Sequence, residues 1–322
     1  MYNFKLSNDI MLKANKIGIF THANVDGDAV GSAFSLYHYL VGIGKDVDVI
    51  SDTTLPTQLD FLNVTSKICQ RAKEGYDLVI ATDCNNADMM GVNKSSFYKC
   101  SNSIQFDHHP LNPEFAKVNN IETAVSSASE IVAKFFIENN IPITNEIGKF
   151  LLSGIITDSG GFKFSCTTSD TMIVVSEILN QSGIELSHIM SCLFESESRD
   201  SFEMQKYAIN HTEFLFDGQA AIIKIDNSFF AKTGIDPNAC KFLTRIGTEL
   251  ADVKLTALVS EVTPNVSKVS FRSRKGFDAN ACARAFGGGG HLQASGCKIF
   301  GNFYETIERI KKVLGDEIAC KE

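Results

Sequence analysis

Residues 17–32 read IGIFTHANVDGDAVGS, and this stretch decides the fold class. Its first part, 17–21, predicts a buried strand, because a short apolar run beside a turn is typical of a strand covered on both faces. The segment after Asp28 predicts a helix whose apolar face is formed by Val30, Ala33, Phe34, Tyr37 and Val41. A strand that leads through a short loop into a helix is the repeating unit of α/β proteins.

The same alternation continues as far as residue 181. Further strands are predicted at 45–51, 76–83 and 103–109, and helices at 127–139, 144–157 and 169–181. Strands that alternate with helices predict a mostly parallel sheet, and the ligand crevice of such a sheet lies beyond the carboxyl ends of its strands. We therefore expect functional residues directly after the predicted strands.

The pattern changes in the second half of the chain. Residues 188–212 contain many Ser, Glu and His residues and no strand pattern, and they predict a helical connector. From residue 213 on, one hairpin is predicted around Asp217-Gly218 and a second strand pair around Pro264-Asn265, followed by a helical piece. We expect a first domain over 1–187 and a smaller α/β domain over 213–322.

The composition excludes several classes of protein. The chain has 322 residues, of which 44% are hydrophobic and 21% charged, an ordinary globular balance. A net charge of -8 disfavours binding to long duplex DNA, which depends on many Lys and Arg contacts. No two of the nine cysteines form a CxxC pair, and neither a signal peptide nor a membrane span is predicted. We expect reduced thiols and a cytoplasmic location.

Acidic residues and histidines follow the predicted strands. His22, Asp26 and Asp28 come after the first strand, Asp83 ends the strand 76–83, and Asp107-His108-His109 ends the strand 103–109. The fourth position is Asp158, in a Gly/Ser turn after an apolar helix. Taken singly, each carboxylate also fits a turn or a helix cap. Together they supply enough histidines and carboxylates for two divalent cations, and the mixed donor set favours Mn²⁺ or related ions.

Two such cations, about 4 Å apart, can clamp the attacking and leaving oxygens of a phosphoryl transfer. The sequence therefore predicts a two-metal phosphoesterase.

A basic, glycine-rich segment lies in the second domain. Between Lys268 and Lys298 the chain has six Lys or Arg residues and one acidic residue. Arg272 and Arg274 precede the run Gly287-Gly288-Gly289-Gly290-His291. Backbone N–H groups of successive glycines can crowd an anion, and Arg makes bidentate phosphate contacts. The alternative is a flexible turn beside a solvated basic face.

These residues resemble the DHH/DHHA1 phosphoesterase superfamily. The resemblance rests on HANVDGDAVGS at 22–32, Asp83, DHHP at 107–110, TDSGGFKF at 157–164, and RSR followed by GGGGH, in the family's order over nearly the whole chain. Length and domain order are most similar to the branch of bifunctional oligoribonucleases, or nanoRNases, and pAp phosphatases. Val25 stands where the family often has Pro. Met89 stands where many relatives have Arg, which leaves one substrate contact of the family without its residue.

The resemblance implies a role for each motif. It implies one metal held by His22, Asp26 and Asp83, and a second held by Asp28, Asp83, His108 and Asp158, with Asp83 as the bridging, catalytic carboxylate. It implies Mn²⁺ as the preferred ion, with Mg²⁺ or Co²⁺ as substitutes. It also implies substrate contacts from a catalytic His109 and, in the second domain, from Arg272, Arg274, Gly287, Gly288, Gly289, Gly290 and His291.

Several activities share these motifs. Hydrolysis of short RNA oligonucleotides and of pAp to AMP is the first expectation. A phosphodiesterase for cyclic or linear dinucleotides and a polyphosphatase are alternatives of the same chemistry, since the same metals serve all of them. A catalytically silent nucleotide-binding protein is a further alternative, and it predicts a broken ligand set. The sequence leaves the oligomeric state open, a homodimer included.

Overall fold

A computed structural model describes residues 2–23, 25–52 and 55–321. The chain forms two compact units, Met1–Ser196 and Glu197–Glu322. The division falls within the predicted connector, because the helix α7 (Leu186–Phe194) belongs to the first unit and α8 (Arg199–Asn210) to the second. Each unit is described by itself below.

The first unit is built on a six-stranded parallel sheet, which confirms the predicted α/β class. Its strands, in spatial order, are β3 (Ile68–Cys69), β2 (Asp46–Ile50), β1 (Lys16–Phe20), β4 (Leu78–Thr82), β5 (Ser103–Asp107) and β6 (Val118–Ile121). The strand order reverses between β1 and β4, so the crevice of this doubly wound sheet lies beyond the carboxyl ends of these two strands.

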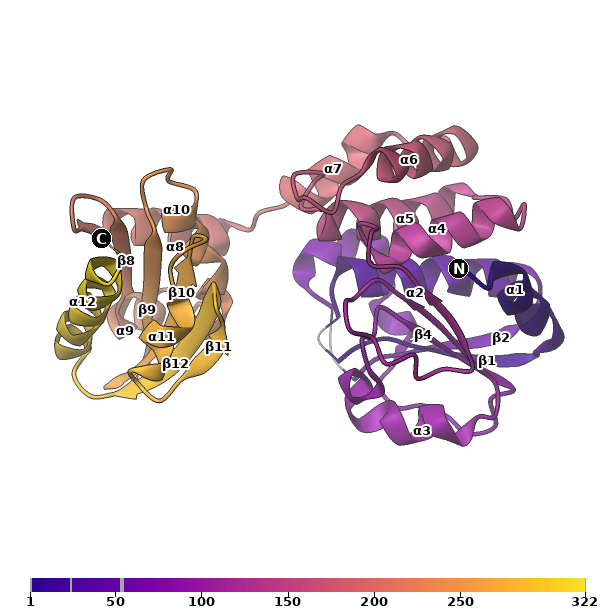
Figure 1. The fold of residues 1–322 in the computed structure, drawn as a ribbon, viewed down its shortest axis with the longest axis horizontal. Helices are drawn as coiled ribbons and strands as arrows, with labels where there is room; N and C mark the ends of the chain where they lie inside the picture. The colour runs from indigo at the N-terminus through magenta and orange to yellow at the C-terminus, as the bar shows by residue number, and fades with distance from the viewer. Residues whose placement is uncertain (1, 24, 53–54, 322) are drawn as a thin grey trace. The chain divides into compact units, whose positions relative to one another are not determined.

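Helices cover both faces of this sheet (Figure 1). The larger core lies under α1 (Phe4–Lys13), α2 (Gly27–Gly42), α4 (Ala128–Glu138), α5 (Asn145–Asp158) and α6 (Ser169–Ser182). A smaller core around Phe20 and Phe97 lies on the side of α3 (Lys94–Lys99) and the 3-10 helix η3 (Ala87–Asn93). Because both faces are covered, strands such as β4 are buried at every position, as the sequence predicts.

Helices α2 and α5 touch almost backbone to backbone. A Cβ atom on Gly27 would collide with Oγ1 of Thr157, and one on Gly31 would lie 2.6 Å from the carbonyl oxygen of Phe150. A Cβ atom on Gly154 would collide with Oγ of Ser129 on α4 and would lie 3.0 Å from Oδ1 of Asp28 on α2. Three small residues thus let two helices that carry predicted ligands, Asp28 and Asp158, approach each other closely.

The second unit contains a six-stranded mixed sheet. Its strands, in spatial order, are β11 (Gly289–His291), β12 (Ala294–Phe300), β10 (Val266–Ser273), β9 (Leu255–Thr263), β8 (Ala220–Ile225) and β7 (Thr212–Leu215). Both predicted antiparallel pairs are confirmed, β7 with β8 and β9 with β10. Its helices are α8, α9 (Asn227–Thr233), α10 (Arg245–Thr248), α11 (Ala279–Arg284) and α12 (Phe303–Ala319), with the 3-10 helix η4 (Pro237–Thr244).

The structure differs from the predictions in several places. The elements that were not predicted include α1, β6 and α12. Val41, expected on the apolar face of α2, is 43% exposed, because that helix emerges from the core at its last turn. Part of the glycine run, for which no strand was predicted, forms the edge strand β11. All nine cysteines are free thiols.

None of the helices in the described part of the chain combines the length and the apolar character needed to cross a bilayer.

Candidate metal centre

The six predicted ligands converge at the reversal point of the first sheet. His22 follows β1, Asp26 is the N-cap of α2 and Asp28 lies in its first turn. Asp83 follows β4, His108 follows β5, and Asp158 is the last residue of α5. Their ligand atoms form three groups, each within 4.8 Å: His22, Asp26 and Asp83; Asp28, His108 and Asp158; and Asp83, His108 and His109.

Asp83 is the only residue of these groups whose two carboxylate oxygens face different histidines. Its Oδ2 lies 3.3 Å from Nε2 of His22, and its Oδ1 lies 3.6 Å from Nε2 of His108 and 3.6 Å from Nδ1 of His109. Oδ1 is buried without a hydrogen-bond partner. The backbone of Asp83 has a φ of 55°, a left-handed conformation that Asp tolerates better than most residues. This turn aims the carboxylate into the cluster.

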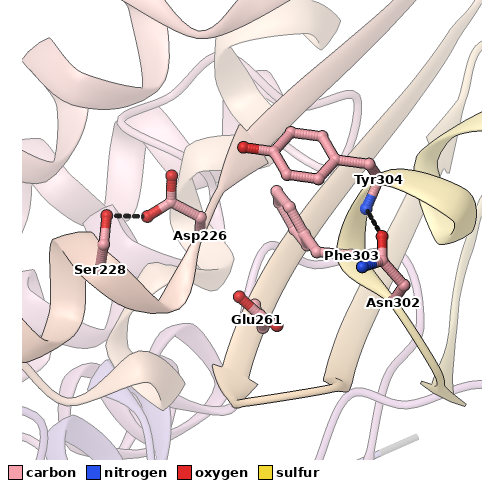
Figure 2. A pocket seen from close by; sticks show the side chains of 6 residues that line it. All are labelled: Asp226, Ser228, Glu261, Asn302, Phe303 and Tyr304. Atoms are coloured by element: carbon pink, nitrogen blue, oxygen red, sulfur yellow. Dashed lines mark hydrogen bonds between the residues drawn. The ribbon is translucent and has the colours of Figure 1, made fainter.

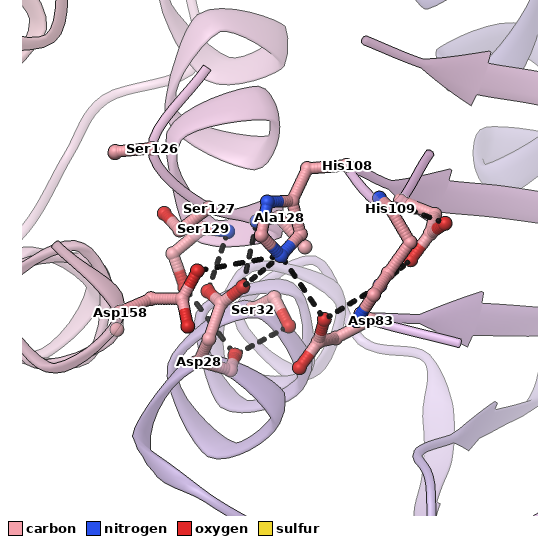
Figure 3. Close-up of polar contacts among 12 residues, drawn as sticks. Asp28, Ser32, Asp83, His108, His109, Ser126, Ser127, Ala128, Ser129 and Asp158 are labelled. Carbon is pink, nitrogen blue, oxygen red and sulfur yellow. Dashed lines mark hydrogen bonds and ion pairs between the residues drawn. The ribbon is translucent and has the colours of Figure 1, made fainter. Parts of the chain in front are cut away.

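His108 lies between the acidic residues on the other side of the cluster (Figure 3). Its Nε2 is 3.3 Å from Oδ2 of Asp158, 3.6 Å from Oδ1 of Asp83 and 3.9 Å from Oδ2 of Asp28. One imidazole nitrogen thus faces three carboxylates that come from three different elements. Such a convergence of carboxylates on one point is unfavourable unless positive charge is present.

Asp28 is buried and held by the first turn of α4. Its Oδ2 accepts a hydrogen bond from the amide of Ala128 at 2.6 Å, and its Oδ1 accepts one from the amide of Ser129 at 2.8 Å. Figure 3 shows these residues above the helix that carries Asp28. Each oxygen retains a second lone pair, so the two amides orient the carboxylate and still leave it able to bind a cation.

His109 is oriented by Asp107, which is fully buried. Nδ1 of His109 lies 2.9 Å from Oδ1 of Asp107, and the backbone amide of His109 donates to Oδ2 of the same carboxylate at 3.2 Å. Asn112 also donates to that Oδ2. The hydrogen bond to Asp107 raises the pKa of His109 to about 9, although burial opposes it. The other ring nitrogen, Nε2, stays available for a ligand.

The carboxylates of the cluster disturb one another's protonation. Burial, followed by the charge of Asp28, raises the pKa of Asp158 to about 7. The same two causes raise the pKa of Asp83 well above its ordinary value. Burial lowers the pKa of His22, but hydrogen bonds to Asp26 and Asp83 outweigh it and raise that pKa to about 10. The protein without cations thus retains protons where a cation could replace them.

The donor chemistry fits divalent metal ions. The groups combine imidazole nitrogens with carboxylate oxygens, the set that suits Mn²⁺ and related ions. The unpartnered Oδ1 of Asp83 and the raised pKa values of two carboxyl groups both indicate missing positive charge. The Asp/His clusters are therefore consistent with metal sites.

The predicted anion site of the second unit is arranged differently. Arg272 on β10 and His291 on β11 both pair with Ala294 of β12, so their side chains lie on the same face of the sheet on either side of a small residue. Arg272 donates from Nη1 to the carbonyl of its neighbour Phe271 at 3.0 Å. Arg274 instead donates to three more distant backbone carbonyls, those of Val253, Thr248 and Leu250, at 2.9–3.2 Å. Its guanidinium supports a loop of its own unit, so the geometry favours Arg272 over Arg274 as a substrate contact.

The glycines of this run have different reasons to be glycine. Gly287 (φ 72°) and Gly290 (φ 149°) have positive φ values, and a Cβ atom on Gly288 would collide with the carbonyl oxygen of Gly296. Gly289 has neither restriction, because the nearest atom to an added Cβ, Oδ1 of Asn280, is 4.0 Å away. Local backbone structure thus explains three of the four glycines, and Gly289 is the one that neither a positive φ nor a steric contact requires.

The second unit also contains a polar hollow of about 270 Å³ (Figure 2). Its lining includes the carboxylates of Asp226 and Glu261 together with Tyr304. A phosphate group would be repelled by these two carboxylates. The hollow therefore does not suit the anionic ligand that the basic segment predicts.

Met89, the residue that departs from the family pattern, has a structural role. Its Sδ accepts a hydrogen bond from the amide of Asn85 at 3.2 Å, and its carbonyl oxygen accepts one from Ala23 at 2.7 Å. Met89 thus connects the loop after β4 to the loop after β1.

The residues that surround the ligands were not predicted from the sequence. Asn112 and the amides of Ala128 and Ser129 are examples. The sequence does contain a signal for the two amides, since Ser127 and Glu130 have the spacing of an N-cap residue and the third residue of its helix. That spacing predicts where a helix begins, but it does not show that the helix points at Asp28.

Comparison with known proteins agrees with this geometry. Residues 16–155 match the model of the DHH family, N-terminal domain, and residues 218–319 match the DHHA1 domain. A bifunctional oligoribonuclease and PAP phosphatase NrnA of Thermus thermophilus is 26% identical over 94% of this chain and 90% of its own length. A probable manganese-dependent inorganic pyrophosphatase of Streptococcus thermophilus is 30% identical over 53% of this chain and 57% of its own length.

A solved structure shows the same fold. An exopolyphosphatase-related protein from Bacteroides fragilis superposes with a TM-score of 0.84 at 23% identity, covering 99% of this chain and 97% of that one. The two matched domains, in this order, and the Asp/His clusters at the reversal point of the sheet lead to one conclusion: the chain belongs to the DHH/DHHA1 phosphoesterase family.

Proposed function

We propose that this chain hydrolyses short RNA oligonucleotides to mononucleotides and dephosphorylates pAp to AMP, using two Mn²⁺ ions. The observation that carries the proposal is the placement of Asp83, whose two oxygens face His22 on one side and His108 on the other. A carboxylate with this placement suits a bridge between two cations. The similarity to a bifunctional oligoribonuclease and PAP phosphatase along nearly the whole chain supports the substrate class.

The proposed ligand sets follow the groups described above. One ion takes His22, Asp26 and Asp83, and the other takes Asp28, His108 and Asp158 together with Asp83. When bound, the ions supply positive charge at the scissile phosphate and lower the pKa of water. His109, fixed through Asp107, presents Nε2 to a phosphate oxygen. Arg272, His291 and the open backbone at Gly289 are the proposed substrate contacts of the second unit.

A substrate panel tests the proposal. The protein should lose activity in excess EDTA and regain it best with Mn²⁺, and it should release mononucleotides from a diribonucleotide and AMP from pAp. A cyclic dinucleotide, pyrophosphate and polyphosphate complete the panel, because relatives named for other activities share the fold or part of the sequence. Exclusive hydrolysis of polyphosphate would replace the proposed substrates, and full activity in EDTA would contradict the metal chemistry.

A preference for short oligomers follows from charge. The net charge is -8, and the basic segment of the second unit is its local exception. A long RNA would gain few phosphate contacts outside the site and would be repelled elsewhere. We expect the highest kcat/KM at roughly two to five nucleotides. A length ladder at fixed salt measures this, and equal efficiency on 20-mers would instead indicate a processive exonuclease.

A further inference from the structure

The N-terminal turn of α4 is built around a carboxylate that no catalytic role explains. Glu130 is fully buried. Its Oε2 accepts hydrogen bonds from the amide of Ser126 at 2.9 Å, from Oγ of Ser126 at 2.7 Å and from Oγ1 of Thr171 at 2.9 Å. Its Oε1 lies 2.7 Å from Nζ of Lys134. A carboxylate is rarely buried unless it is paired and hydrogen-bonded in this way, and removing a partner is strongly unfavourable.

These contacts go beyond what a helix cap requires. In a capping box the side chain of the third helical residue returns to the amide of the N-cap residue. Here Ser127 is the N-cap and receives the amide of Glu130 at 3.0 Å. The Glu130 side chain reaches past it to Ser126 and across to Thr171, in the first turn of α6. Glu130 therefore fixes the segment that precedes the helix and ties it to a second helix.

That segment ends in the two amides that hold Asp28. Ala128 and Ser129 directly follow the N-cap, and their N–H groups are among those that a helix leaves unpaired in its first turn. Both donate to the carboxylate of Asp28, which lies about one hundred residues earlier in the chain. The orientation of the Asp28 carboxylate thus depends on the position of this turn as well as on its own helix, α2.

We propose that Glu130 is a positioning residue for metal binding: with Lys134 it fixes the turn Ser126–Ser129, so that two amides hold Asp28 in the orientation that binds a cation. The inference rests on the proposed function, in which Asp28 is a ligand of the second ion. It predicts that Glu130 affects the ion held by Asp28, His108 and Asp158 and spares the ion held by His22, Asp26 and Asp83.

The test is the binding of Mn²⁺ to the full chain, measured by titration calorimetry and by the electron paramagnetic resonance signal of free Mn²⁺. The variant is Glu130→Gln. Its side-chain amide points an N–H donor at Ser126 or Lys134 and so disturbs the turn, while the volume of the side chain stays the same. The matched control is Ile131→Val, a buried change on the same helix whose side chain is in the apolar core. Thr171→Val, which removes one hydrogen bond to Glu130, is a milder second variant.

In Glu130→Gln we expect the Mn²⁺ affinity of one of two sites to fall by about 10-fold or more, an effect typical of residues that orient metal ligands. The Mn²⁺ affinity of the other site should change by less than about 3-fold. Thr171→Val should show a smaller loss of Mn²⁺ affinity at the same site. The catalytic activity of both variants, Glu130→Gln and Thr171→Val, should return at saturating Mn²⁺. Ile131→Val should bind as the wild type does.

Unchanged Mn²⁺ affinities in Glu130→Gln would overturn the inference, as would equal losses in Glu130→Gln and Ile131→Val, which would mark a purely structural role. A wild-type protein that binds no Mn²⁺ would overturn the proposed function itself. The two failures are thus distinguished within one experiment.

Discussion

The two units contain motifs of equal prominence in the sequence, but the structure treats them differently. In the first unit, all six predicted ligands come within 4.8 Å of other members of their groups, and an oxygen at the centre has no hydrogen-bond partner. In the second unit, Arg274 is bonded to three carbonyls, and local backbone structure explains three of the four glycines. Polar groups left without an internal partner indicate a ligand more strongly than a conspicuous sequence motif does.

The largest effect is expected at Asp83. Asp83→Asn keeps a residue that accepts the positive φ, but it weakens the proposed bridge to both ions. We expect loss of both metals and a fall in kcat/KM on the order of 1,000-fold or more, since metal ions supply several kcal/mol of transition-state stabilisation. The metal content of the purified variant measures the loss of the ions. Asp88→Asn, at an exposed residue paired with Lys94, is the control. Two ions retained in Asp83→Asn would remove the bridge from the proposal.

The two arginines of the second unit should separate binding from stability. Arg274→Ala removes contacts to three carbonyls and should lower the free energy of unfolding by about 1–2 kcal/mol. Arg272→Ala should leave the melting temperature unchanged and raise KM by roughly 10-fold, more than it lowers kcat, if its phosphate contact is equally strong in the ground and transition states. Thermal melting and steady-state kinetics of both variants test this. The reverse pattern would make Arg274 the substrate contact.

A pair of glycine variants sharpens the same contrast. Gly288→Ala forces a Cβ into the backbone of β12 and should cost about 1–3 kcal/mol of stability. In Gly289→Ala the nearest atom to the new Cβ is 4.0 Å away, so this variant should melt like the wild type. If a ligand approaches this backbone, Gly289→Ala should nevertheless raise KM. An unchanged KM for every substrate of the panel would show that the glycine run serves the fold alone.

The smallest effect concerns pH. The pKa of Asp158 is raised from 3.8 to about 7, so between these values the folded chain holds a proton that the unfolded chain has lost. Stability of the metal-free protein should therefore fall as pH rises through this window. In EDTA, the melting temperature of the wild type should decrease from about pH 5 to about pH 7.5 by a few degrees more than that of Asp158→Asn. Equal slopes would show that Asp158 titrates normally.

Much of the first sheet could be predicted, because β1 and β4 contain apolar runs and because β1, β4 and β5 are each followed within two residues by an acidic residue or a histidine. The strand β6, Val118–Ile121, could not. Two of its four residues are asparagines, and Asn120 is buried only because its side chain donates to Oγ of Ser7 on α1 and to the carbonyl of Gln105. That strand depends on tertiary contacts, which local propensity does not report.

The same distinction holds for the site. The cluster of histidine and aspartate side chains was predictable because turns and helix caps alone seldom require so many of these residues directly after buried strands. The role of the turn Ser126–Ser129 was not predictable, because the turn contributes backbone amides to the site and almost every residue of any sequence has one. Arg274 was predicted to contact the substrate because charge pattern cannot show whether a guanidinium already has internal acceptors.

The contact between α2 and α5 has a consequence for how this protein can change. Most helix pairs are separated by a layer of side chains, and a substitution in that layer shifts the helices by fractions of an ångström. At Gly27, Gly31 and Gly154 an added Cβ atom would collide with atoms of a neighbouring helix, so these positions leave no room for a larger side chain. The separation of Asp28 and Asp158 therefore depends on these three glycines more than on the side chains of the surrounding core. Substitutions elsewhere in that core can accumulate without moving the two carboxylates, provided that the glycines are retained.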